Sequence, residues 1–545
     1  MRHLLACTAI APVLVALTAT NAAAETTIGS STTTAVKTST VASGAADAIT
    51  VSSAGSITLT SGTAITMDSN NNVSNAGSLT INDADNATGI LVKAGTTGNI
   101  TNSGTITLTE DYTATDTDSD GDIDGTFAKG TNRNGILVES GAAHTGNIDT
   151  TGTISIEGNN SAGIRVNSTL IGNLSTYGTI SVVGDNSYGV VANDIDGNAT
   201  IRGSISTKGA NSTAVALLGD VDGAVKIQGT IVSTGYRSTT RPSDVTKLDA
   251  DDLLQGGPAL VIAGNVSGGI VFDVAPTASD DDDEDDTDID DDGLLDSTET
   301  TATVINYGSA AAVQIGSASA DTSIGVVQGD SSGYGVVVRG AIAGYGIYDG
   351  VDANAMVIGG LGGDVDIAKG VLVAGSITAI SYDSNATALR LGSGATSDAI
   401  EISGTVAASG AALANTTSRG LVIDAGAQVN SVKVSGTVAA VAADDEKGRA
   451  IAILDSSGTV SSLSNTGTIS ATGGLTNTAI DLSANSSGVT LTQALASSTA
   501  TAPSIIGDVK LGSGDDVMTV SAGRIVGDVS LGAGNNSLSL SGSST

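Results

Sequence analysis

The chain has 545 residues, among them 72 glycines, nine tyrosines, two phenylalanines and no tryptophan. Globular enzymes of this size normally pack aromatic side chains into their cores, so this chain must build its core from isoleucine, valine, leucine and alanine. The net charge of −36 argues against nucleic acid as a partner, because neutralising phosphates requires Lys and Arg, and against adsorption to an anionic membrane.

Residues 1–24 have the pattern of a cleavable export signal. Arg2 supplies a basic start, a mostly apolar run follows, and Ala22–Ala24 offer a small-residue cleavage site. The apolar run is too short for a membrane anchor, and Cys7 precedes most of it, unlike the cysteine of a lipoprotein. Cleavage leaves a mature chain without cysteine, and no later segment is predicted to span a membrane as a helix.

A repeat of about 26 residues organises the first half of the mature chain. In GTISI from Gly152, Ile154 and Ile156 point to one face and the intervening residues to the other, as in a half-buried strand. One step, from Gly104 to Gly152, is much longer than the others, which predicts one coil with an insertion near 109–132. The repeats start at Gly77, Gly104, Gly152, Gly178, Gly203 and Gly229.

This pattern predicts an all-β fold, a right-handed parallel β-helix with acidic loop insertions. A single repeat cannot bury its apolar face alone, but stacked repeats can. Each glycine before a strand is expected at a corner with positive φ, and Asn75 and Asn102 are expected to stack as a polar ladder. Roughly 18 coils would give a rod on the order of 90 Å long. Disorder and a β-sandwich are the alternatives.

The repeat loosens along the chain and then changes. The spacing between repeats is wider and less regular at Gly375, Gly404, Gly436 and Gly467. We therefore predict a signal at 1–24, a β-helical region at 25–504 and a final region at 505–545 with a shorter repeat that joins Gly507 to Gly527. Further insertions are predicted near 236–258, where SDVTKLDADDLL could form a short amphipathic helix or lid, and near 274–303.

The signal, the coils of N-x-G-T-I type and the closing G-D-V-x-L-G-x-G-x-[DN] repeats together resemble the passenger region of outer-membrane autotransporters, especially large alphaproteobacterial ones. The resemblance spans nearly the whole mature chain. It implies surface display and a C-terminal outer-membrane barrel that carries the passenger across. The sequence ends at LSLSGSST without the aromatic-rich strands of such a barrel, so we expect a fragment or truncated product. A protein released without its own barrel is the alternative.

Residues 288–299 read DIDDDGLLDSTE and match D-x-D-x-D-G-x5-E, the spacing of a 12-residue calcium loop. Hard oxygen ligands at alternate positions converge on one ion, while Gly293 permits the sharp turn. The alternative is a solvated acidic insertion that keeps the rod soluble. The predicted ligands are Asp288, Asp290, Asp292, the carbonyl of Leu294, Asp296 and a bidentate Glu299.

A second acidic stretch, DTDSDGDIDG, repeats the beginning of this spacing. Position twelve is Phe127, so the bidentate ligand is missing. Both stretches interrupt the repeat, and we expect bound calcium to order them against the coils. The predicted ligands of this loop are Asp116, Asp118, Asp120 and Asp122.

Catalysis has few candidate residues, so we expect no enzyme. After cleavage the only histidine is His144, and it lies in a predicted corner turn. We expect an exported rod at the cell surface or outer membrane, or released to the medium. It would serve adhesion by contacting host or neighbouring cell-surface molecules or polysaccharide. The alternatives are a secreted calcium-binding matrix protein and a β-helical polysaccharide-degrading enzyme.

Overall fold

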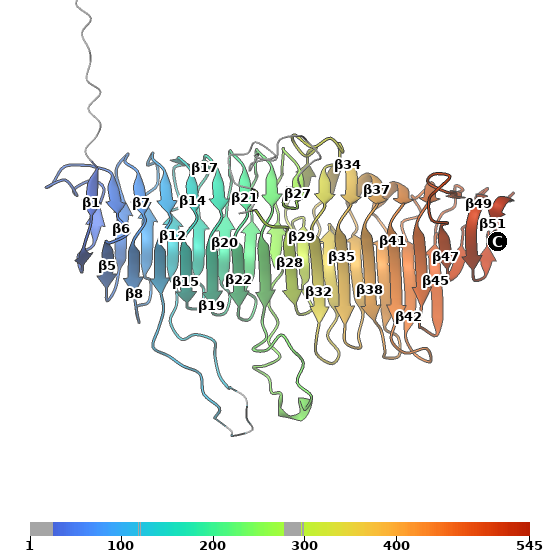
Figure 1. Cartoon of the computed structure of the whole chain (residues 1–545), viewed down its shortest axis with the longest axis horizontal. Coiled ribbons are helices and arrows are strands. Elements are labelled where there is room, and N and C mark those ends of the chain that lie inside the picture. The colour runs from blue at the N-terminus through green and yellow to red at the C-terminus, as the bar shows by residue number, and fades with distance from the viewer. Residues whose placement is uncertain are drawn as a thin grey trace, which may run out of the picture.

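The computed structural model is a long stack of parallel strands (Figure 1). Each regular coil contributes one strand to each of three faces, here called A, B and C, and equivalent residues of successive coils pair in register, as Thr105 does with Thr153 and Thr153 with Thr179. This arrangement is a parallel β-helix, as the period predicts. The structure describes residues 25–117, 119, 121, 123–276, 296 and 299–544.

Face C is a single sheet of 16 strands, close to the roughly 18 coils expected. At about 4.8 Å per coil, 16 rungs correspond to a length of roughly 75 Å. Its strands are β3 (Val36–Lys37), β6 (Thr63–Met67), β9 (Thr88–Val92), β12 (Asn134–Val138), β16 (Ala162–Val166), β20 (Tyr188–Ala192), β23 (Thr213–Leu217), β26 (Leu260–Ile262), β29 (Ala311–Ile315), β33 (Ala353–Ile358), β36 (Ala386–Leu391), β39 (Thr417–Ile423), β42 (Arg449–Asp455), β45 (Thr476–Asp481), β48 (Asp508–Lys510) and β50 (Val529–Ser530).

Face A contains the strand that precedes each repeat glycine. Its strands are β1 (Thr26–Ile28), β4 (Ile49–Val51), β7 (Val73–Asn75), β10 (Ile100–Asn102), β14 (Ile148–Thr150), β18 (Leu174–Thr176), β21 (Ala199–Ile201), β24 (Val225–Ile227), β27 (Ile270–Phe272), β30 (Thr322–Ile324), β31 (Val336–Val338), β34 (Val365–Val373), β37 (Ala395–Ile402), β40 (Gln428–Val434), β43 (Ser462–Asn465), β46 (Thr490–Gln493), β49 (Val517–Val526) and β51 (Ser537–Ser544). The short pair β13 (His144–Thr145) and β17 (Leu170–Ile171) lies beside this face.

Face B contains the strand that follows each repeat glycine. Its strands are β2 (Ser31–Thr32), β5 (Ser56–Leu59), β8 (Ser78–Ile81), β11 (Thr105–Leu108), β15 (Thr153–Glu157), β19 (Thr179–Val183), β22 (Ser204–Lys208), β25 (Thr230–Thr234), β28 (Thr303–Tyr307), β32 (Ala341–Gly346), β35 (Ser376–Ser381), β38 (Thr405–Gly410), β41 (Thr437–Ala442), β44 (Thr468–Thr472) and β47 (Ser504–Ile506), with the end of β49 completing it.

The interior is a set of aliphatic columns, one side chain per coil. On face B, Ile106, Ile154, Ile180, Ile205 and Ile231 stack in register, and all are fully buried. Of the aromatic residues that the structure describes, only Phe272 belongs to this main core. The core is therefore built from small branched side chains, as the composition predicts.

The expected polar ladder at the corner between faces A and B is present. Asn75 Nδ2 donates to Asn102 Oδ1 at 2.8 Å, and Asn102 Nδ2 donates to Thr150 Oγ1 at 3.0 Å. All three side chains are fully buried. Stacked amides thus satisfy one another inside the rod, which is how a polar column can be buried without a large cost.

The expectation of positive φ is wrong for the glycines of the 26-residue repeat, although Gly507 and Gly527 of the closing repeats have positive φ, at 117° and 147°. Gly104, Gly152, Gly178 and Gly203 are all outside the left-handed region. Glycine is required there because coils approach too closely for a side chain. A Cβ built on Gly178 would lie 1.9 Å from the carbonyl oxygen of Gly152, and one on Gly152 would lie 2.0 Å from that of Gly104.

Two insertions leave the rod along the same edge, the corner between faces B and C, and extend downward in Figure 1. Residues 109–132 connect β11 to β12, and residues 235–258 lie between β25 and β26. The second insertion contains a three-residue 3₁₀ helix, η1 (Val245–Lys247), within the stretch where the sequence predicts a short amphipathic helix or lid. None of the helices among the described residues is long and apolar enough to cross a membrane.

The last coils keep the shorter step of the closing repeats. Strand β49 pairs with β51 so that Val517 lies opposite Ser537. At the turns, Asp515 Oδ1 accepts a hydrogen bond from the N–H of Asn535 at 2.8 Å, and Asp508 Oδ1 accepts one from that of Asp528 at 3.1 Å. These aspartates therefore serve as turn acceptors between coils.

Candidate functional site: a groove on face C and a lobe beside it

A column of asparagines follows the corner that leads into face C. Asn86, Asn132, Asn160, Asn186 and Asn211 each lie two positions before a strand of that face, and each has φ between 53° and 59°. Asparagine tolerates this left-handed conformation better than other non-glycine residues. All five side chains are exposed, so the corner presents one amide per coil.

The amides of this column partly bond to one another. Asn132 Nδ2 donates to Asn86 Oδ1 at 3.2 Å, and Asn211 Nδ2 donates to Asn186 Oδ1 at 3.3 Å. Asn160 Nδ2 donates to the hydroxyl of Thr131 at 3.4 Å. The backbone N–H of each bonds to the next coil, as that of Asn160 does to the Asp185 carbonyl at 2.8 Å. The column is thus held in a fixed register.

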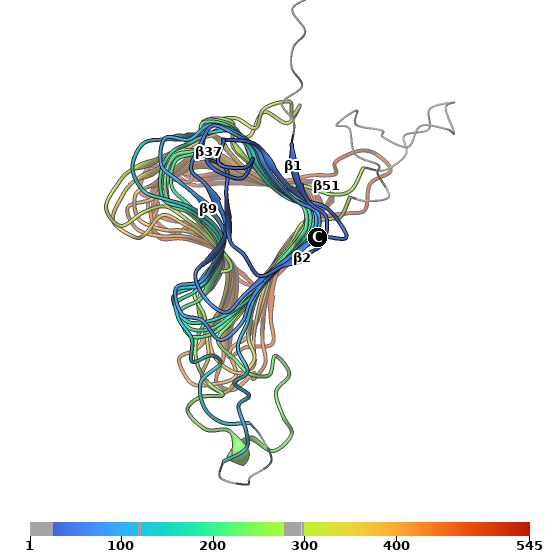
Figure 2. The ribbon, with the colours of Figure 1, turned by 90° about the vertical axis from the view of Figure 1, so that its left-hand side faces the viewer.

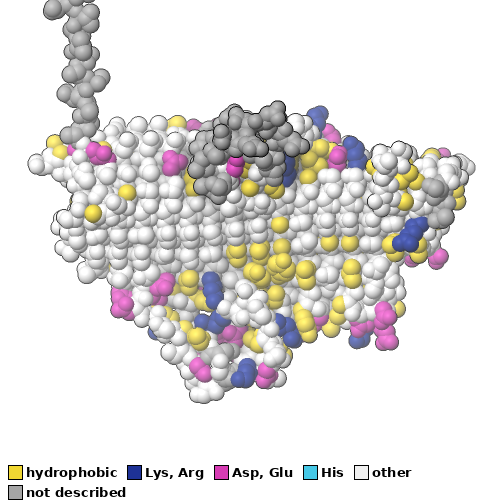
Figure 3. Space-filling view, in the orientation of Figure 1, with side chains coloured by type: hydrophobic (Ala, Val, Ile, Leu, Met, Phe, Trp, Pro, Cys, Tyr) yellow, Lys and Arg dark blue, Asp and Glu magenta, His cyan; other side chains and the backbone are white. Residues whose placement is uncertain are grey.

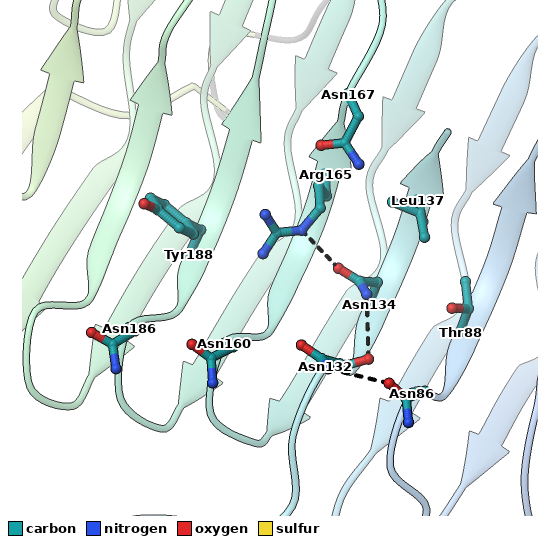
Figure 4. Close-up of a pocket in the computed structure, with 10 residues that line it drawn as sticks. All are labelled: Asn86, Thr88, Asn132, Asn134, Leu137, Asn160, Arg165, Asn167, Asn186 and Tyr188. Carbon is teal, nitrogen blue, oxygen red and sulfur yellow. Dashed lines mark hydrogen bonds between the residues drawn. The ribbon is translucent and has the colours of Figure 1, made fainter. Parts of the chain in front are cut away.

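Four of these amides, all except that of Asn211, form one wall of an open groove of about 640 Å³ that runs across β9, β12, β16 and β20 (Figure 4). Figure 4 shows the asparagines in a row, one per coil, with the strand residues beside them. The ten lining residues are Asn86, Thr88, Asn132, Asn134, Leu137, Asn160, Arg165, Asn167, Asn186 and Tyr188.

Arg165 is the only charged residue in this lining. Its Nε donates to Asn134 Oδ1 at 3.0 Å, and its guanidinium lies 5.6 Å from the centre of the Tyr188 ring. Burial lowers the pKa of Arg165, which nevertheless stays protonated. Arg165 therefore fixes both a neighbouring amide and the ring that borders the groove.

The two insertions on the same edge form one body, here called the lobe (residues 109–132 and 235–258; Figure 2). Asp251 Oδ2 accepts a hydrogen bond from the N–H of Gly125 at 2.7 Å, although these residues are 126 positions apart. Arg237 joins the insertions too, because it bonds to Asp251 and to the Gly125 carbonyl and lies 4.8 Å from the Phe127 ring centre.

Aromatic side chains, of which the main core of the described rod holds only Phe272, are gathered at the lobe. Tyr236 and Tyr348 pack edge to face with their ring centres 4.7 Å apart. The guanidinium of Arg241 lies 4.0 Å from the Tyr382 ring centre and bonds to Asp349 at 2.7 Å. Arginine and aromatic contacts, rather than aliphatic columns, thus hold the lobe to the rod.

The base of the first insertion is closed by a buried ion pair. Arg133 Nη2 lies 3.5 Å from Glu110 Oε2, and the two side chains are 2% and 7% exposed. The Glu110 carboxylate also accepts hydrogen bonds from the N–H groups of Lys129 and Gly130, at 2.7 and 2.6 Å. Both ends of the insertion are therefore tied to one carboxylate.

Three carboxylates meet where the insertions touch. The nearest oxygens of Asp124, Asp249 and Asp251 lie within 4.8 Å of one another. A side-chain hydrogen bond to Asp251 raises the pKa of Asp249. Burial acts to raise the pKa of Asp251, but the bonds from Asp249, Arg237 and the Gly125 N–H outweigh it and lower that pKa. The cluster is therefore stabilised by groups of the chain itself.

A second cavity, of about 410 Å³, lies between the lobe and the rod. Its wall includes Ile123, Lys208, Arg237, Leu248 and Tyr348. Lys208 Nζ donates to the Arg237 carbonyl at 2.7 Å, and burial together with the charge of Arg237 lowers the pKa of Lys208. The apolar walls and the constrained amine make this a different environment from the amide groove.

The predicted calcium ligands are only partly within the described residues. Asp116 lies in the lobe, where its carboxylate accepts hydrogen bonds from the N–H groups of Ser119 and Gly121 at 2.6 and 3.2 Å. The remaining ligands of the DTDSDGDIDG stretch, Asp118, Asp120 and Asp122, and four of those in residues 288–299, Asp288, Asp290, Asp292 and Leu294, lie outside the described residues.

The last two predicted ligands lie where the chain returns to the rod. The carbonyl of Asp296 accepts a hydrogen bond from the N–H of Glu299 at 3.1 Å. The side chain of Glu299 is fully buried, with Oε1 3.6 Å from Arg202 Nη1. This carboxylate faces the coils, and its coordination of calcium stays a prediction.

The groove was not predicted from the sequence, although a signal for it was present. Asparagine recurs from coil to coil between Asn86 and Asn211, always two positions before a strand of face C. The cross-insertion contacts carry no such signal, because Asp251 and Gly125 are joined only by the packing of the coils between them.

The comparisons with known proteins give no match: no protein-family model, no curated protein and no solved structure is significantly similar to this chain. The fold therefore stands on the strand pairing and register described above.

Proposed function

We propose that this protein is an exported, surface-displayed autotransporter passenger, a non-enzymatic rod that serves adhesion or cell-surface interaction. The export-signal pattern of residues 1–24 and the resemblance of the repeats support export and display. The observation that carries the proposal is the architecture itself. A stack of 16 rungs on face C holds a groove and a lobe at fixed positions along its side.

A rigid solenoid suits this role because its exposed faces repeat at each coil. Repeated weak contacts sum through avidity, so a long rod can hold a surface without any single tight site. The amide column from Asn86 to Asn211 is such a repeated feature. Loops on a stiff scaffold are also the usual place for recognition, which is the part we assign to the lobe.

The non-enzymatic part of the proposal is supported by the position of His144, the one histidine after residue 24. It is fully buried, and its Nδ1 lies 3.0 Å from Thr96 Oγ1. A buried imidazole cannot reach a substrate as general base. Incubation with polysaccharides and measurement of new reducing ends tests this part; sustained release would contradict it.

The calcium part of the proposal rests on the aspartate spacing of the two acidic stretches. We expect calcium to bind the folded mature chain and to slow proteolysis in the insertions. Calorimetry measures the binding directly, with magnesium as the control ion. Absence of a binding heat at millimolar calcium would contradict this part while leaving the display of the rod untouched.

Surface display is tested on intact cells that produce the native protein. We expect external protease to remove the rod from the cells, and an antibody to the coils to label them without permeabilisation. A periplasmic marker that stays intact is the control for an unbroken envelope. Protein that is protected from protease until the cells are lysed would contradict the proposal.

A further inference from the structure

The groove on face C has the chemistry of a site for a neutral, hydroxyl-rich ligand. Its lining is dominated by side-chain amides and contains no carboxylate, although the chain carries a net charge of −36. A side-chain amide both donates and accepts hydrogen bonds, so it can bond to a hydroxyl as donor or as acceptor. Arg165, the single cation, is already bonded to Asn134.

The amides of this groove are not required by the backbone. Glycine is the usual residue at positive φ, and this chain uses it at many other turns, for example at Gly350 and Gly359, where φ is 72°. At this corner, in contrast, Asn86, Asn132 and Asn160 keep a polar side chain in successive coils. The column therefore supplies hydrogen-bonding groups beyond what the turn needs.

The spacing of the amides indicates an extended ligand along the rod. Successive coils are about 4.8 Å apart, and this is of the order of the length of one sugar unit in a linear polysaccharide. The groove crosses β9, β12, β16 and β20, so it offers a site for several consecutive units (Figure 4). Tyr188 provides an aromatic face on which one ring can stack.

Two other linear ligands fit less well. A polyanion would meet one cation and the field of a strongly acidic chain, so it would be repelled. An extended peptide binds a sheet by pairing with a free strand edge, but β12 is already paired on both sides, with β9 and β16. Neither the charge nor the backbone of the groove favours them.

We propose that this groove binds a neutral linear polysaccharide that lies along the axis of the rod. The proposal rests on the proposed function, since it names the partner chemistry that a surface-displayed rod would recognise. Asn132, Asn160 and Asn186 bond to hydroxyls, Tyr188 stacks against a sugar ring, and Arg165 positions Asn134 and the ring.

The test is affinity electrophoresis of the mature chain in native gels that contain hydroxyethyl cellulose, soluble starch, galactomannan or polygalacturonate. We expect at least one of the three neutral polymers to retard the chain, and polygalacturonate to leave its mobility unchanged. Retardation by polygalacturonate alone, or by none of the four polymers, would overturn the proposal.

The variants Asn160→Gly and Asn186→Gly remove the amide and keep the positive φ, so the coil is retained. Each is expected to weaken retardation about fivefold, as for the loss of one hydrogen bond, and Tyr188→Ala by at least as much. Asn415→Gly is the matched control, because Asn415 is also exposed, has positive φ and lies two positions before a strand of face C, but it is outside the groove lining. Equal retardation of all the variants would place binding elsewhere and refute the site.

The two proposals fail in distinguishable ways. If the chain binds a neutral polymer through the groove but is protected from protease on intact cells, the ligand proposal holds and surface display is refuted. If the chain is displayed on cells but no neutral polymer retards it, surface display holds and the ligand proposal is refuted.

Discussion

The rod and the lobe are built by different means. In the rod, Ile154 pairs with Ile180 and Ile180 with Ile205, so each coil repeats the contacts of the one before it. In the lobe, residues 126 positions apart meet through single contacts, such as that between Gly125 and Asp251. Figure 3 shows the same division: charged side chains gather over the lobe, while the flat face beside it has few.

This difference in construction indicates which interactions stabilise the rod and which stabilise the lobe. A solenoid is stabilised mainly by interfaces between neighbouring coils. A defect in one coil therefore weakens only the adjacent interfaces, but it uncouples the unfolding of the coils on its two sides. The lobe depends on ion pairs and on arginine packed against aromatic rings, which are few and not replaceable by a neighbour. A substitution in the rod should therefore change the free energy of unfolding, whereas a substitution in the lobe should change how readily the lobe opens.

The largest effect is expected from Gly178→Ala. The new Cβ would lie 1.9 Å from the Gly152 carbonyl oxygen, a backbone atom that cannot move without separating two coils. We expect a loss of about 3 kcal/mol or more in the free energy of unfolding, and a urea transition that splits into two steps. Circular dichroism during urea unfolding measures both.

Gly29→Ala is the control for this prediction. Its Cβ would meet nothing closer than Ser52 Oγ, at 3.9 Å, so the free energy of unfolding should change by less than about 0.5 kcal/mol. If Gly178→Ala behaved like this control, the close approach of the coils would not be what requires glycine in the column.

The second effect is expected from Glu110→Ala at the base of the lobe. This change leaves the Arg133 guanidinium buried without its carboxylate and frees two backbone N–H groups. Removal of one partner of a buried pair costs about 3 kcal/mol. We expect faster proteolysis of residues 109–132, measured by mass spectrometry of the fragments.

Glu139→Ala provides the comparison for Glu110→Ala. Glu139 pairs with Lys93 at 2.6 Å, but these side chains are 35% and 43% exposed, so the loss should be below about 1 kcal/mol. Equal losses for the two variants would show that burial does not set the strength of the Glu110 pair.

A smaller effect is expected from Arg237→Ala. This variant removes the contact with Phe127 and the bond to the Gly125 carbonyl, so the two insertions should be held together less tightly. The combination with Phe127→Ala should reveal a coupling of about 1 kcal/mol, because both side chains serve one contact. The rod itself should unfold at the same urea concentration, since no coil is altered; a shift of that midpoint would contradict the division.

The smallest effect is expected from pH at His144. Burial lowers its pKa below the ordinary value of 6.5, so the unfolded chain takes up the proton more readily than the folded chain. The contribution of neutral, buried His144 to the free energy of unfolding is therefore fully present above about pH 6.5. It is lost as the pH falls from there toward the folded-state pKa. His144→Gln should remove this loss, as unfolding measured on either side of the ordinary histidine pKa would reveal; parallel curves for the two proteins would contradict it.

The rod could be predicted from the sequence because its rule is local. Alternation within GTISI and the regular step between repeats were sufficient for the parallel coils, the aliphatic core and the Asn75–Asn102 ladder. The reason for the glycines was misjudged, since a sequence cannot distinguish a residue that needs positive φ from one that lacks space for a Cβ. Gly178 belongs to the second kind.

The groove and the lobe were harder to predict for different reasons. The asparagines of the groove recur with the coils, so the sequence contains their alignment but not the groove that they line. For the lobe, the length of an insertion in the sequence does not reveal the direction in which it leaves the rod. The coils between the two insertions set where along the rod each loop emerges. They therefore bring residues 109–132 and 235–258 to the same edge.

The sequence by itself thus determined the coil, its register and its core, because each depends on residues within one repeat and its neighbour. Only the tertiary structure decided which side chains share a surface. It placed the carboxylates of Asp124 and Asp251 together, buried Glu299 beside Arg202 and brought Tyr188 to the amide column. These contacts follow from stacking the coils in space, which brings together side chains that lie far apart along the chain.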